Sequence, residues 1–343
     1  MNIYDLAREA GVSIATASKA LNGRGDVNEQ TRMKVVDTAR RLNYHPSHMA
    51  RGLARRRTEN IGVIVQRRFD CSFFSNPFYS KVLEGMELEI TARNYNLLLN
   101  VLPGEGVGAS LPQLPKLVRE KNADGLVLLG EMPRDLLVEV FDRRIPSVNV
   151  DFHTPSLLGH YVLTDNRGGM HSLVEHLAGL GHRRIALVQS DLQDWSFVER
   201  QAGFEAACRL RGLECEVWPV TSRDWALTRL TLAQRLGAPR RPSAVLGIND
   251  EHAIAALEAA KSIGLKVPSD LSVAGFDDID AAGEGDKALT TFRVDKRRMG
   301  IEAIRTVFRL MEPPVEPTSR LDLPGEVVVR QTTAPAVAEA LLG

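Results

Sequence analysis

The sequence predicts two kinds of structure in one chain, a small all-helical domain over residues 1–45 and an α/β body over residues 59–343. Up to residue 43, apolar residues recur every three or four positions, which is typical of amphipathic helices. From residue 59, short aliphatic runs alternate with longer apolar helical stretches, which is typical of parallel sheets covered by helices on both faces. The length of the body suits two such lobes better than one.

The first predicted helix begins after Asn2, whose side chain can cap it in a capping box with Asp5. It ends at Gly11, because glycine readily adopts the left-handed conformation that closes helices. One face of this helix is apolar, since Ile3, Leu6, Ala7 and Ala10 stand at i, i+3, i+4 and i+7.

The second predicted helix follows a turn at Val12 and Ser13, and Ser13 can cap it. Its inner face carries Ala17, Ala20 and Leu21, and its outer face carries Ile14, Ala15, Thr16, Ser18, Lys19 and Asn22. A third helix is expected from about residue 28 to 43, with Val35, Val36, Ala39 and Leu42 inward. The pattern fits a helix-turn-helix that reads DNA from the start of its second helix. Any small three-helix domain would show similar patterning, so this alternative stays open.

Charge is distributed unevenly along the chain. The whole sequence balances 43 Lys and Arg against 43 Asp and Glu. Residues 1–58 hold 11 basic and 5 acidic residues, a net charge of +6, which leaves −6 on the remainder. A basic head on an acidic body is typical of a domain that binds a polyanion such as DNA with salt-sensitive affinity. A solvated basic face is the simpler alternative.

The body alternates predicted strands and helices along its length. Buried strands are expected at 61–65, 96–101, 125–129, 147–150, 184–188, 244–248 and 272–276. Helices are expected at 78–93, 168–180, 199–211 and 251–263. Ligands of such sheets bind at the carboxyl ends of the strands, so polar residues that follow strands are candidate site residues.

Several segments resemble the lactose-repressor/galactose-repressor (LacI/GalR) family of bacterial transcription regulators. They are residues 3–13 (IYDLAREAGVS), 16–22 (TASKALN), 42–46 (LNYHP), 50–54 (ARGLA), 61–65 (IGVIV) and 327–335 (VVVRQTTAP). The resemblance spans nearly the whole chain and is far more specific than a lone helix-turn-helix pattern. It implies a DNA-binding domain over 1–45, a hinge over 46–58, and an effector domain of the two-lobed, type I periplasmic-binding-protein-like fold over 59–343.

The resemblance assigns DNA contacts in the head. Ile14, Ala15 and Ser18 match positions that reach base edges, and Lys19 stands where Arg is common in the family. Ile14 and Ala15 carry no hydrogen-bonding side-chain group, so apolar contact with thymine methyls is the readout open to them. Positions that hold the DNA backbone match Tyr4, Ser13, Thr16, Asn22 and Thr31.

The hinge is implied to fold when two copies meet on DNA. Pro46 ends the third helix, because the residue before proline avoids helical geometry. Leu53 matches an apolar wedge that opens a base step in the minor groove, and Arg51 and Ala54 accompany it as expected contacts. An ordinary linker leucine is the alternative reading of Leu53.

The family fold implies two lobes joined by three crossing strands near 161–164, 290–294 and 321–323. Lobe 1 would then cover about 59–162 and 293–322, and lobe 2 about 163–292 and 323–343. An effector, most often a sugar in the family, would bind between them. The residues expected to bind it are Phe78, Tyr79, Asp151, Trp195, Arg200, Asn249 and Asp277, with Trp225 as a weaker candidate.

Some of these residues have plainer readings. Asp250 and Asp278 are expected to cap helices, and each tryptophan can be partly core. The segment 66–75, which precedes Phe78 and Tyr79, is about six residues longer than the family's usual link.

Other features point away from metal, cofactor and enzymatic chemistry. Cys71, Cys208 and Cys215 lack metal-ligand spacing, and three cysteines in a chain this long suggest reduced thiols. Residues 104–108 (GEGVG) imitate a phosphate loop, but prolines follow instead of a clean helix start, which indicates a surface turn. With no signal peptide and no long apolar span in the sequence, a cytoplasmic protein is expected, nucleoid-associated when bound to its operator.

The sequence therefore predicts a transcriptional regulator, most simply a repressor, which as a homodimer binds a near-palindromic DNA operator and responds to a small molecule. A two-lobed solute-binding protein is the alternative, although the basic head argues against it. An enzyme on a dinucleotide-binding fold is disfavoured, because no glycine fingerprint follows the first strand of the body.

Overall fold

The computed structural model describes residues 2–21, 27–44, 57–66, 75–103, 114–155, 157–284, 288–314 and 317–337. The chain forms two compact units, Met1–Glu59 and Asn60–Gly343, here called the head and the body. Within the described residues, no helix is both long enough and apolar enough to cross a membrane.

The described part of the head contains α1 (Ile3–Ala10), α2 (Ile14–Leu21) and α3 (Glu29–Arg41). Asn2 and Asp5 form the predicted capping box, and Gly11 closes α1 with a φ of 67°. The hydroxyl of Ser13 accepts the backbone N–H of Thr16 at 3.1 Å and so caps α2. Buried Leu6, Ala7, Ala10, Ala17, Ala20, Val35 and Ala39 form the core of the head.

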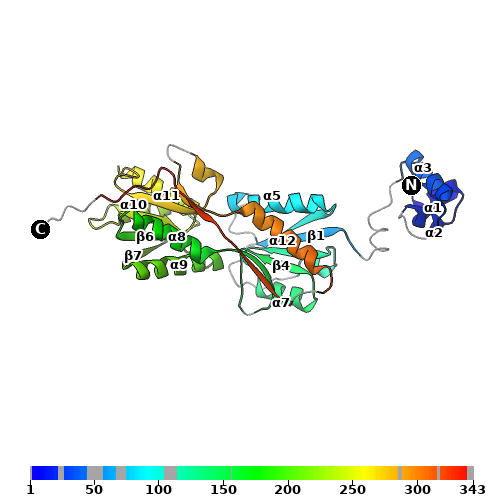
Figure 1. Ribbon diagram of the computed structural model, residues 1–343, viewed down its shortest axis with the longest axis horizontal. Coiled ribbons are helices and arrows are strands. Elements are labelled where there is room, and N and C mark those ends of the chain that lie inside the picture. The colour runs from blue at the N-terminus through cyan, green and yellow to red at the C-terminus, as the bar shows by residue number, and fades with distance from the viewer. Residues whose placement is uncertain are drawn as a thin grey trace. The chain divides into compact units, whose positions relative to one another are not determined.

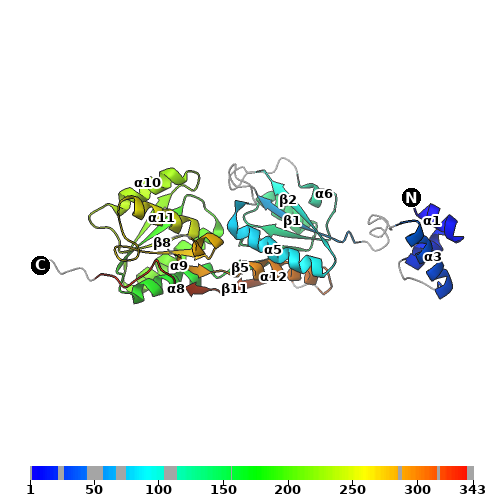
Figure 2. The same ribbon diagram turned by 90° about the horizontal axis from the view of Figure 1, so that it is seen from above.

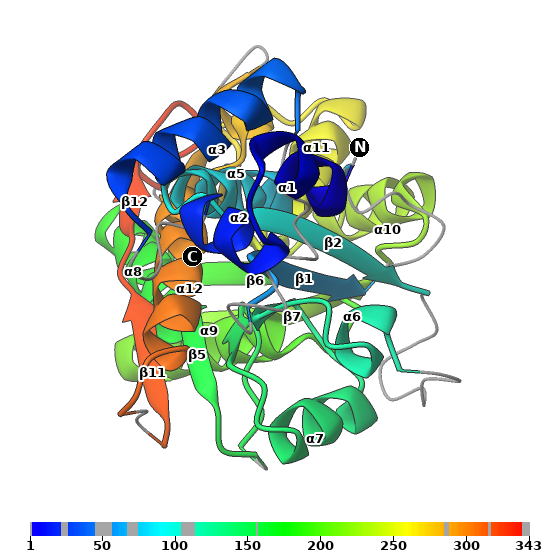
Figure 3. The ribbon, with the colours of Figure 1, turned by 90° about the vertical axis from the view of Figure 1, so that its right-hand side faces the viewer.

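The first sheet of the body has six strands in the order β11-β5-β4-β3-β1-β2, and its described pairs are parallel. Its strands are β1 (Asn60–Gln66), β2 (Asn96–Leu102), β3 (Gly125–Leu129), β4 (Ser147–Val150), β5 (His160–Thr164) and β11 (Ser319–Leu323). Helices α6 (Lys116–Arg119) and α7 (Arg134–Asp142) cover one face, and α5 (Pro77–Ala92) and α12 (Lys296–Leu310) the other (Figure 3). This sheet and its helices are lobe 1.

The second sheet has the order β12-β10-β9-β8-β6-β7. Its strands are β6 (Arg184–Ser190), β7 (Glu214–Val220), β8 (Ala244–Gly247), β9 (Ser272–Asp277), β10 (Thr290–Arg293) and β12 (Glu326–Val328). One face packs on α8 (Asn166–Gly179) and α9 (Trp195–Arg211), and the other on α10 (Trp225–Leu236) and α11 (Asp250–Ser262). This is lobe 2. Figures 1 and 2 show the two lobes side by side within the body.

The chain passes between the lobes three times. It leaves lobe 1 after β5 to enter α8, returns after β10 to enter α12, and leaves again after β11 to enter β12. One apolar core runs through both lobes along the side of α5, α12, α8 and α9. Each lobe is thus discontinuous in sequence, and the predicted fold class is confirmed.

Helices α5 and α12 cross at unusually close range. A Cβ added to Gly85 would overlap the carbonyl group of Arg297, and one added to Gly300 would overlap the carbonyl oxygen of Val82. Only glycine fits at both places, so the two helix backbones lie in direct contact.

The structure adds elements that the sequence pattern did not predict. Edge strand β7 alternates exposed and buried residues in place of a continuous apolar run, and α7, α10 and α12 were not assigned. Helix α9 begins at Trp195, four residues before its expected start. Strand β12 pairs antiparallel with β10, because the third crossing enters lobe 2 from the opposite direction.

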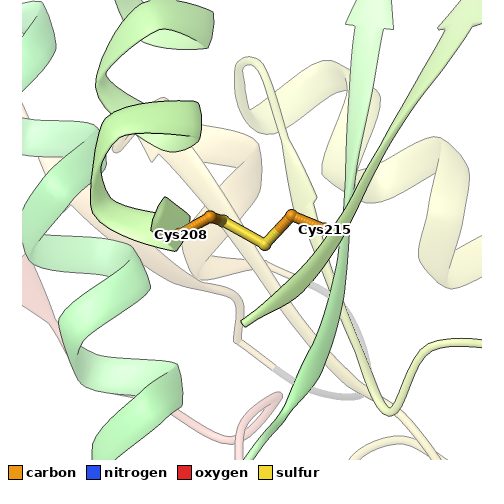
Figure 4. Close-up of a disulfide and its surroundings, with 2 residues drawn as sticks. All are labelled: Cys208 and Cys215. Carbon is orange, nitrogen blue, oxygen red and sulfur yellow. A yellow bond between two sulfur atoms is a disulfide. The ribbon is translucent and has the colours of Figure 1, made fainter. Parts of the chain in front are cut away.

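The expectation of reduced thiols is wrong for two of the three cysteines. Cys208 on α9 and Cys215 on β7 form a disulfide, with their Cα atoms 6.3 Å apart (Figure 4). Gly212 ends α9 in the left-handed conformation, with a φ of 61°, and the chain reverses there into β7. Residues seven positions apart therefore meet. Cys71 lies outside the described residues, as do residues 104–108 and most of the long segment 66–75.

Candidate functional site

The exposed face of α2 presents the residues predicted to read DNA bases. Ile14 is 43% exposed although it is apolar, and Ala15 and Lys19 are exposed beside it. Ser18 is half-buried, while Ala17 and Ala20 fix the opposite face in the core of the head. One face of α2 is therefore fixed in the core of the head, and the opposite face is exposed to solvent, as direct base contact requires.

Four of the residues predicted to hold the DNA backbone, Tyr4, Ser13, Thr16 and Thr31, lie within the described part of the head. Tyr4 is 65% exposed, and the hydroxyls of Ser13 and Thr16 lie 2.8 Å apart. The backbone N–H of Thr31 is bound by the side chain of Asn28, the N-cap of α3. Asn22 and the hinge residues Arg51, Leu53 and Ala54 lie outside the described residues, so their DNA contacts stay predictions.

A cavity of about 300 Å³ lies in the body at the carboxyl ends of strands from both sheets. It receives Phe78, Tyr79 and Asp151 from lobe 1, and Arg200, Asn249 and Asp277 from lobe 2. Six of the seven predicted effector residues thus line one space, although they are spread over 200 positions of the sequence. Their contact with an effector stays a prediction.

Arg200 and Asp277 form a buried ion pair on one wall of this cavity. Arg200 is 2% exposed and Asp277 is 5% exposed, and Nη2 of Arg200 lies 2.8 Å from Oδ1 of Asp277. The other nitrogens of Arg200 donate to the side chain of Asn166 at 2.8 Å and to the carbonyl of Ile248 at 3.0 Å. The guanidinium also lies 3.9 Å from the ring centroid of Phe276. Arg200 is thus held in one orientation.

The backbone at Asp277 is held in an unusual conformation. Its φ is 107° and that of Asp278 is 53°, both on the left-handed side that non-glycine residues rarely adopt. Such residues cost about 1–3 kcal/mol each and persist where surrounding contacts fix them. The buried ammonium of Lys296 supplies these contacts, since it donates to the carbonyls of Asp277, Asp278 and Val294. Burial lowers the pKa of Lys296.

Asp151 brings an acidic group from lobe 1 to the cavity, at a φ of 58°. Its Oδ2 accepts the hydroxyl of Tyr79 at 3.0 Å, and its buried Oδ1 has no hydrogen-bond partner among the described residues. Burial raises the pKa of Asp151 to about 7, against the opposing charge of Arg200. The carboxylates of Asp277 and Asp194, both from lobe 2, add to this rise.

Compared with the wild type, the body of the Asp151→Asn variant should gain stability as the pH rises. The folded-state pKa of about 7 lies above the ordinary value of 3.8, so the folded protein binds this proton more tightly and loses stability as the pH rises from about 4 to 7. The variant lacks this proton, so its free energy of unfolding should gain on the wild type by up to about 1.4 kcal/mol per pH unit in that range. Urea unfolding at pH 5, 6, 7 and 8 measures this.

Asp142→Asn is the matched control for this series, because Asp142 is exposed at the end of α7 in the same lobe. It replaces a carboxyl by an amide at a solvent-exposed position, so it reports what this chemical change alone does to urea unfolding. A pH-independent difference for Asp151→Asn would contradict the buried, ionisable role assigned to Asp151.

Asn249 is committed to its own helix as well as facing the cavity. Its side-chain oxygen accepts the backbone N–H of His252 at 3.1 Å and is also bonded to Nδ1 of that ring. Burial lowers the pKa of His252 to about 4, so the ring is neutral at pH 7, and its Nε2 lies 3.2 Å from the hydroxyl of Ser222. The amide nitrogen of Asn249 donates to Oε2 of Glu251 at 3.4 Å, which leaves Asn249 one amide N–H to offer a ligand.

The expected helix-capping roles of Asp250 and Asp278 are wrong. Asn249 caps α11, and the carboxyl of Asp250 instead accepts the backbone N–H of Ile279 at 2.9 Å and the hydroxyl of Thr291 at 2.5 Å. Burial, followed by the nearby charge of Asp277, raises the pKa of Asp250 to about 8. Asp278 instead forms ion pairs with Arg293 and Arg330. Both carboxyls bind segments distant in sequence, which local spacing does not show.

Trp195 does not line the cavity. Its ring lies 5.7 Å from the ring of His153 and 5.9 Å from the guanidinium of Arg320, and it packs on the α6 and α7 side of lobe 1. Its backbone N–H donates to the carboxylate of Glu131 at 2.7 Å. Trp195 thus links α9 of lobe 2 to lobe 1.

Most of the other residues that line the cavity were not predicted from the sequence. Phe197 and His252 stand on the first turns of α9 and α11, where inward and outward faces look alike in sequence. Trp225, the weaker candidate, does line the cavity. The other lining residues are Gln66, Ser75, Asn76, Pro77, Leu192, Asp194, Ser196, Ser222, Asp250, Glu251 and Ile279.

Comparison with known proteins agrees with this architecture. Residues 2–47 match the family described as bacterial regulatory proteins, lacI family, and residues 174–333 match a periplasmic binding protein-like domain. The chain is 30% identical to the HTH-type transcriptional regulator DegA of Bacillus subtilis (strain 168), with 97% of this chain and 98% of that protein covered. It is also 30% identical to the HTH-type transcriptional repressor PurR of Vibrio parahaemolyticus, with 96% and 98% covered.

Solved structures share the fold over nearly the whole chain. The Lac repressor dimer bound to operator and the anti-inducer ONPF matches with a TM-score of 0.82 at 24% identity, with 97% of this chain and 99% of that chain covered. Together with the relatives in sequence, this shows that the chain belongs to the lacI family of bacterial regulatory proteins, with a helix-turn-helix DNA-binding domain and an effector-binding body.

Proposed function

We propose that this regulator is a cytoplasmic repressor that binds a near-palindromic operator as a homodimer and changes its operator affinity when a small polar molecule, in the family most often a sugar, enters the cavity. The cavity supports this proposal most directly, because charged residues from both lobes line it. A ligand held by Asp151 on one side and by Arg200 and Asp277 on the other would favour one arrangement of the lobes.

The link between the two sites is reciprocal. If the effector changes operator affinity by some factor, operator binding must change effector affinity by the same factor. In this proposal the hinge, with Leu53 as its minor-groove wedge, transmits the change.

The substitution Ile14→Ala should weaken specific operator binding by about tenfold, since lost base contacts typically cost about 1–3 kcal/mol. Binding to random DNA, which rests on phosphate contacts and falls with salt, should stay within twofold. Fluorescence anisotropy with fragments from the DNA flanking its own gene, titrated at 50 and 200 mM salt, measures both. Met33→Ala is the control, because Met33 on α3 is also apolar and 59% exposed.

Two outcomes would count against the proposal. If no fragment competes better than random DNA, the chain is not an operator-binding regulator. In that case a solute-binding protein without a regulatory role, which the body alone also fits, becomes the better reading. If Ile14→Ala and Met33→Ala weaken specific binding equally, α2 is not the reading element.

A further inference from the structure

The cavity is acidic, and this narrows the chemistry of its ligand. Five carboxyl groups line its described part, those of Asp151, Asp194, Asp250, Glu251 and Asp277, and all but Asp250, whose raised pKa of about 8 keeps it neutral at pH 7, add to its negative charge. The guanidinium of Arg200 is the one permanent cation among the described lining residues, and His252 is neutral at pH 7.

The charge of Arg200 is already balanced by Asp277, and three of its five N–H groups have partners in the protein. Its Nη2 is paired with Asp277, its Nε with Asn166 and its Nη1 with the carbonyl of Ile248. Among the described lining residues, a phosphate or carboxylate would find no second cation and would face the remaining carboxyl groups. Such like-charge contacts cost several kcal/mol when they are desolvated.

The carboxyl groups differ in whether their oxygens already have hydrogen-bond partners. Asp277 is satisfied by Arg200, and Asp250 by Ile279 and Thr291. Asp151 is 9% exposed and lines the cavity, and its buried Oδ1 has no hydrogen-bond partner among the described residues. An unsatisfied buried acceptor costs about 1–3 kcal/mol, so a donor from the ligand would remove a penalty already present in the free protein.

Like charges also face each other across the cavity. Asp151 belongs to lobe 1, whereas Asp194 and Asp277, which interact with it electrostatically, belong to lobe 2. A cation between the lobes would relieve this repulsion. Among the described residues, no three His, Cys, Asp or Glu side chains are grouped closely enough to hold a metal ion. The acidic groups therefore suit a larger organic cation.

Aromatic rings complete such a site. Phe78 and Tyr79 from α5, Phe197 from α9 and Trp225 from α10 all line the cavity. The faces of aromatic rings attract ammonium groups, and carboxylates combined with aromatic rings form a common binding set for organic cations.

Building on the proposed function, we propose that the effector is a small hydroxylated amine, of the amino-sugar class, whose ammonium group pairs with Asp151. The hydroxyl groups then fall to Asn249 and to the Arg200–Asp277 pair on the opposite wall. Charge-assisted hydrogen bonds are roughly twice as strong as neutral ones, so the amine is the main determinant of specificity.

The test uses the full-length protein and pairs of sugars that differ only in one amine. D-glucosamine and D-glucose, D-galactosamine and D-galactose, and D-mannosamine and D-mannose are compared at pH 7.5 by thermal shift and calorimetry, with D-glucose 6-phosphate as an anion. In the pair that binds, the amine should bind at least tenfold more tightly than the neutral sugar. Asp151→Asn should reduce this preference to less than threefold, and Asp142→Asn should retain it.

Several results would overturn the inference. They are tighter binding of a neutral sugar, binding of the phosphate, or a preference that survives Asp151→Asn. Absence of binding by every amine at about 10 mM would also overturn it, because a ligand with a Kd of about 1 mM would then occupy most of the protein. Operator affinity, measured with each sugar, separates this inference from the proposed function. A neutral or anionic sugar that alters operator affinity overturns the inference alone, whereas an amine that binds without altering operator affinity overturns the proposed function alone.

Discussion

Replacing Arg200 by Met should destabilise the body by about 3–5 kcal/mol and abolish the ligand response, because removal of one partner of a buried ion pair leaves the other charge uncompensated. Asp277 would then lie buried without its cation, in a backbone conformation that the pair helps to hold. Asn166 and the carbonyl of Ile248 would also lose their donor.

The destabilisation should depend on the partner. Asp277→Asn in the Arg200→Met background removes the uncompensated charge, so the double variant should be more stable than Arg200→Met alone. Urea unfolding followed by tryptophan fluorescence reports on the body selectively, since all three tryptophans, Trp195, Trp218 and Trp225, lie there. Strictly additive effects, or a loss below 1 kcal/mol for Arg200→Met, would show that the pair is not the structural centre of the cavity wall.

Replacing Gly85 or Gly300 by Ala should destabilise the body by about 3 kcal/mol or more, because the added Cβ would meet backbone atoms that cannot rotate away. The two helices would have to separate. The first turn of α5 carries Phe78 and Tyr79 at the cavity, and α12 begins with Lys296 beside Asp277. Ligand affinity should therefore fall together with stability.

Gly179→Ala is the matched control. Gly179 ends α8, and an added Cβ there would meet nothing within 4 Å. Alanine has the better helix propensity, so this variant should be unchanged or more stable by up to about 1 kcal/mol. If all three variants have the same free energy of unfolding as the wild type, the close crossing of α5 and α12 is not required for the fold.

The sequence was most informative where structure depends on neighbouring residues. The capping box at Asn2 and Asp5 and the closing glycine Gly11 form as predicted, because their partners lie within a turn of each other. The continuous apolar strands, such as β3, are likewise buried over their whole length. Edge strand β7 was missed, because an edge needs burial on one face only and its alternation is weaker.

The candidate site shows the same division. Asp151, Arg200, Asn249 and Asp277 were predicted from their places after strands and from the family resemblance, and the structure brings them to one cavity. Trp195 was expected there as well, but tertiary packing turns its ring toward His153 and lobe 1. Whether a residue at the start of α9 faces the cavity or lobe 1 depends on how the helix is rotated about its axis. Local periodicity does not fix this rotation.

By itself, the sequence determined the helices of the head, the buried strands of the body, the basic head on an acidic body and the family to which the chain belongs. Only the tertiary structure decided that Lys296 holds the turn at Asp277, that Asp250 binds β10 instead of capping α11, and that Cys208 meets Cys215. The physical reason is that the partner of a buried polar or reactive group is chosen by the packing of whole elements. Such partners lie up to tens of residues away in the sequence. No local sequence pattern encodes which helix will pack on which strand.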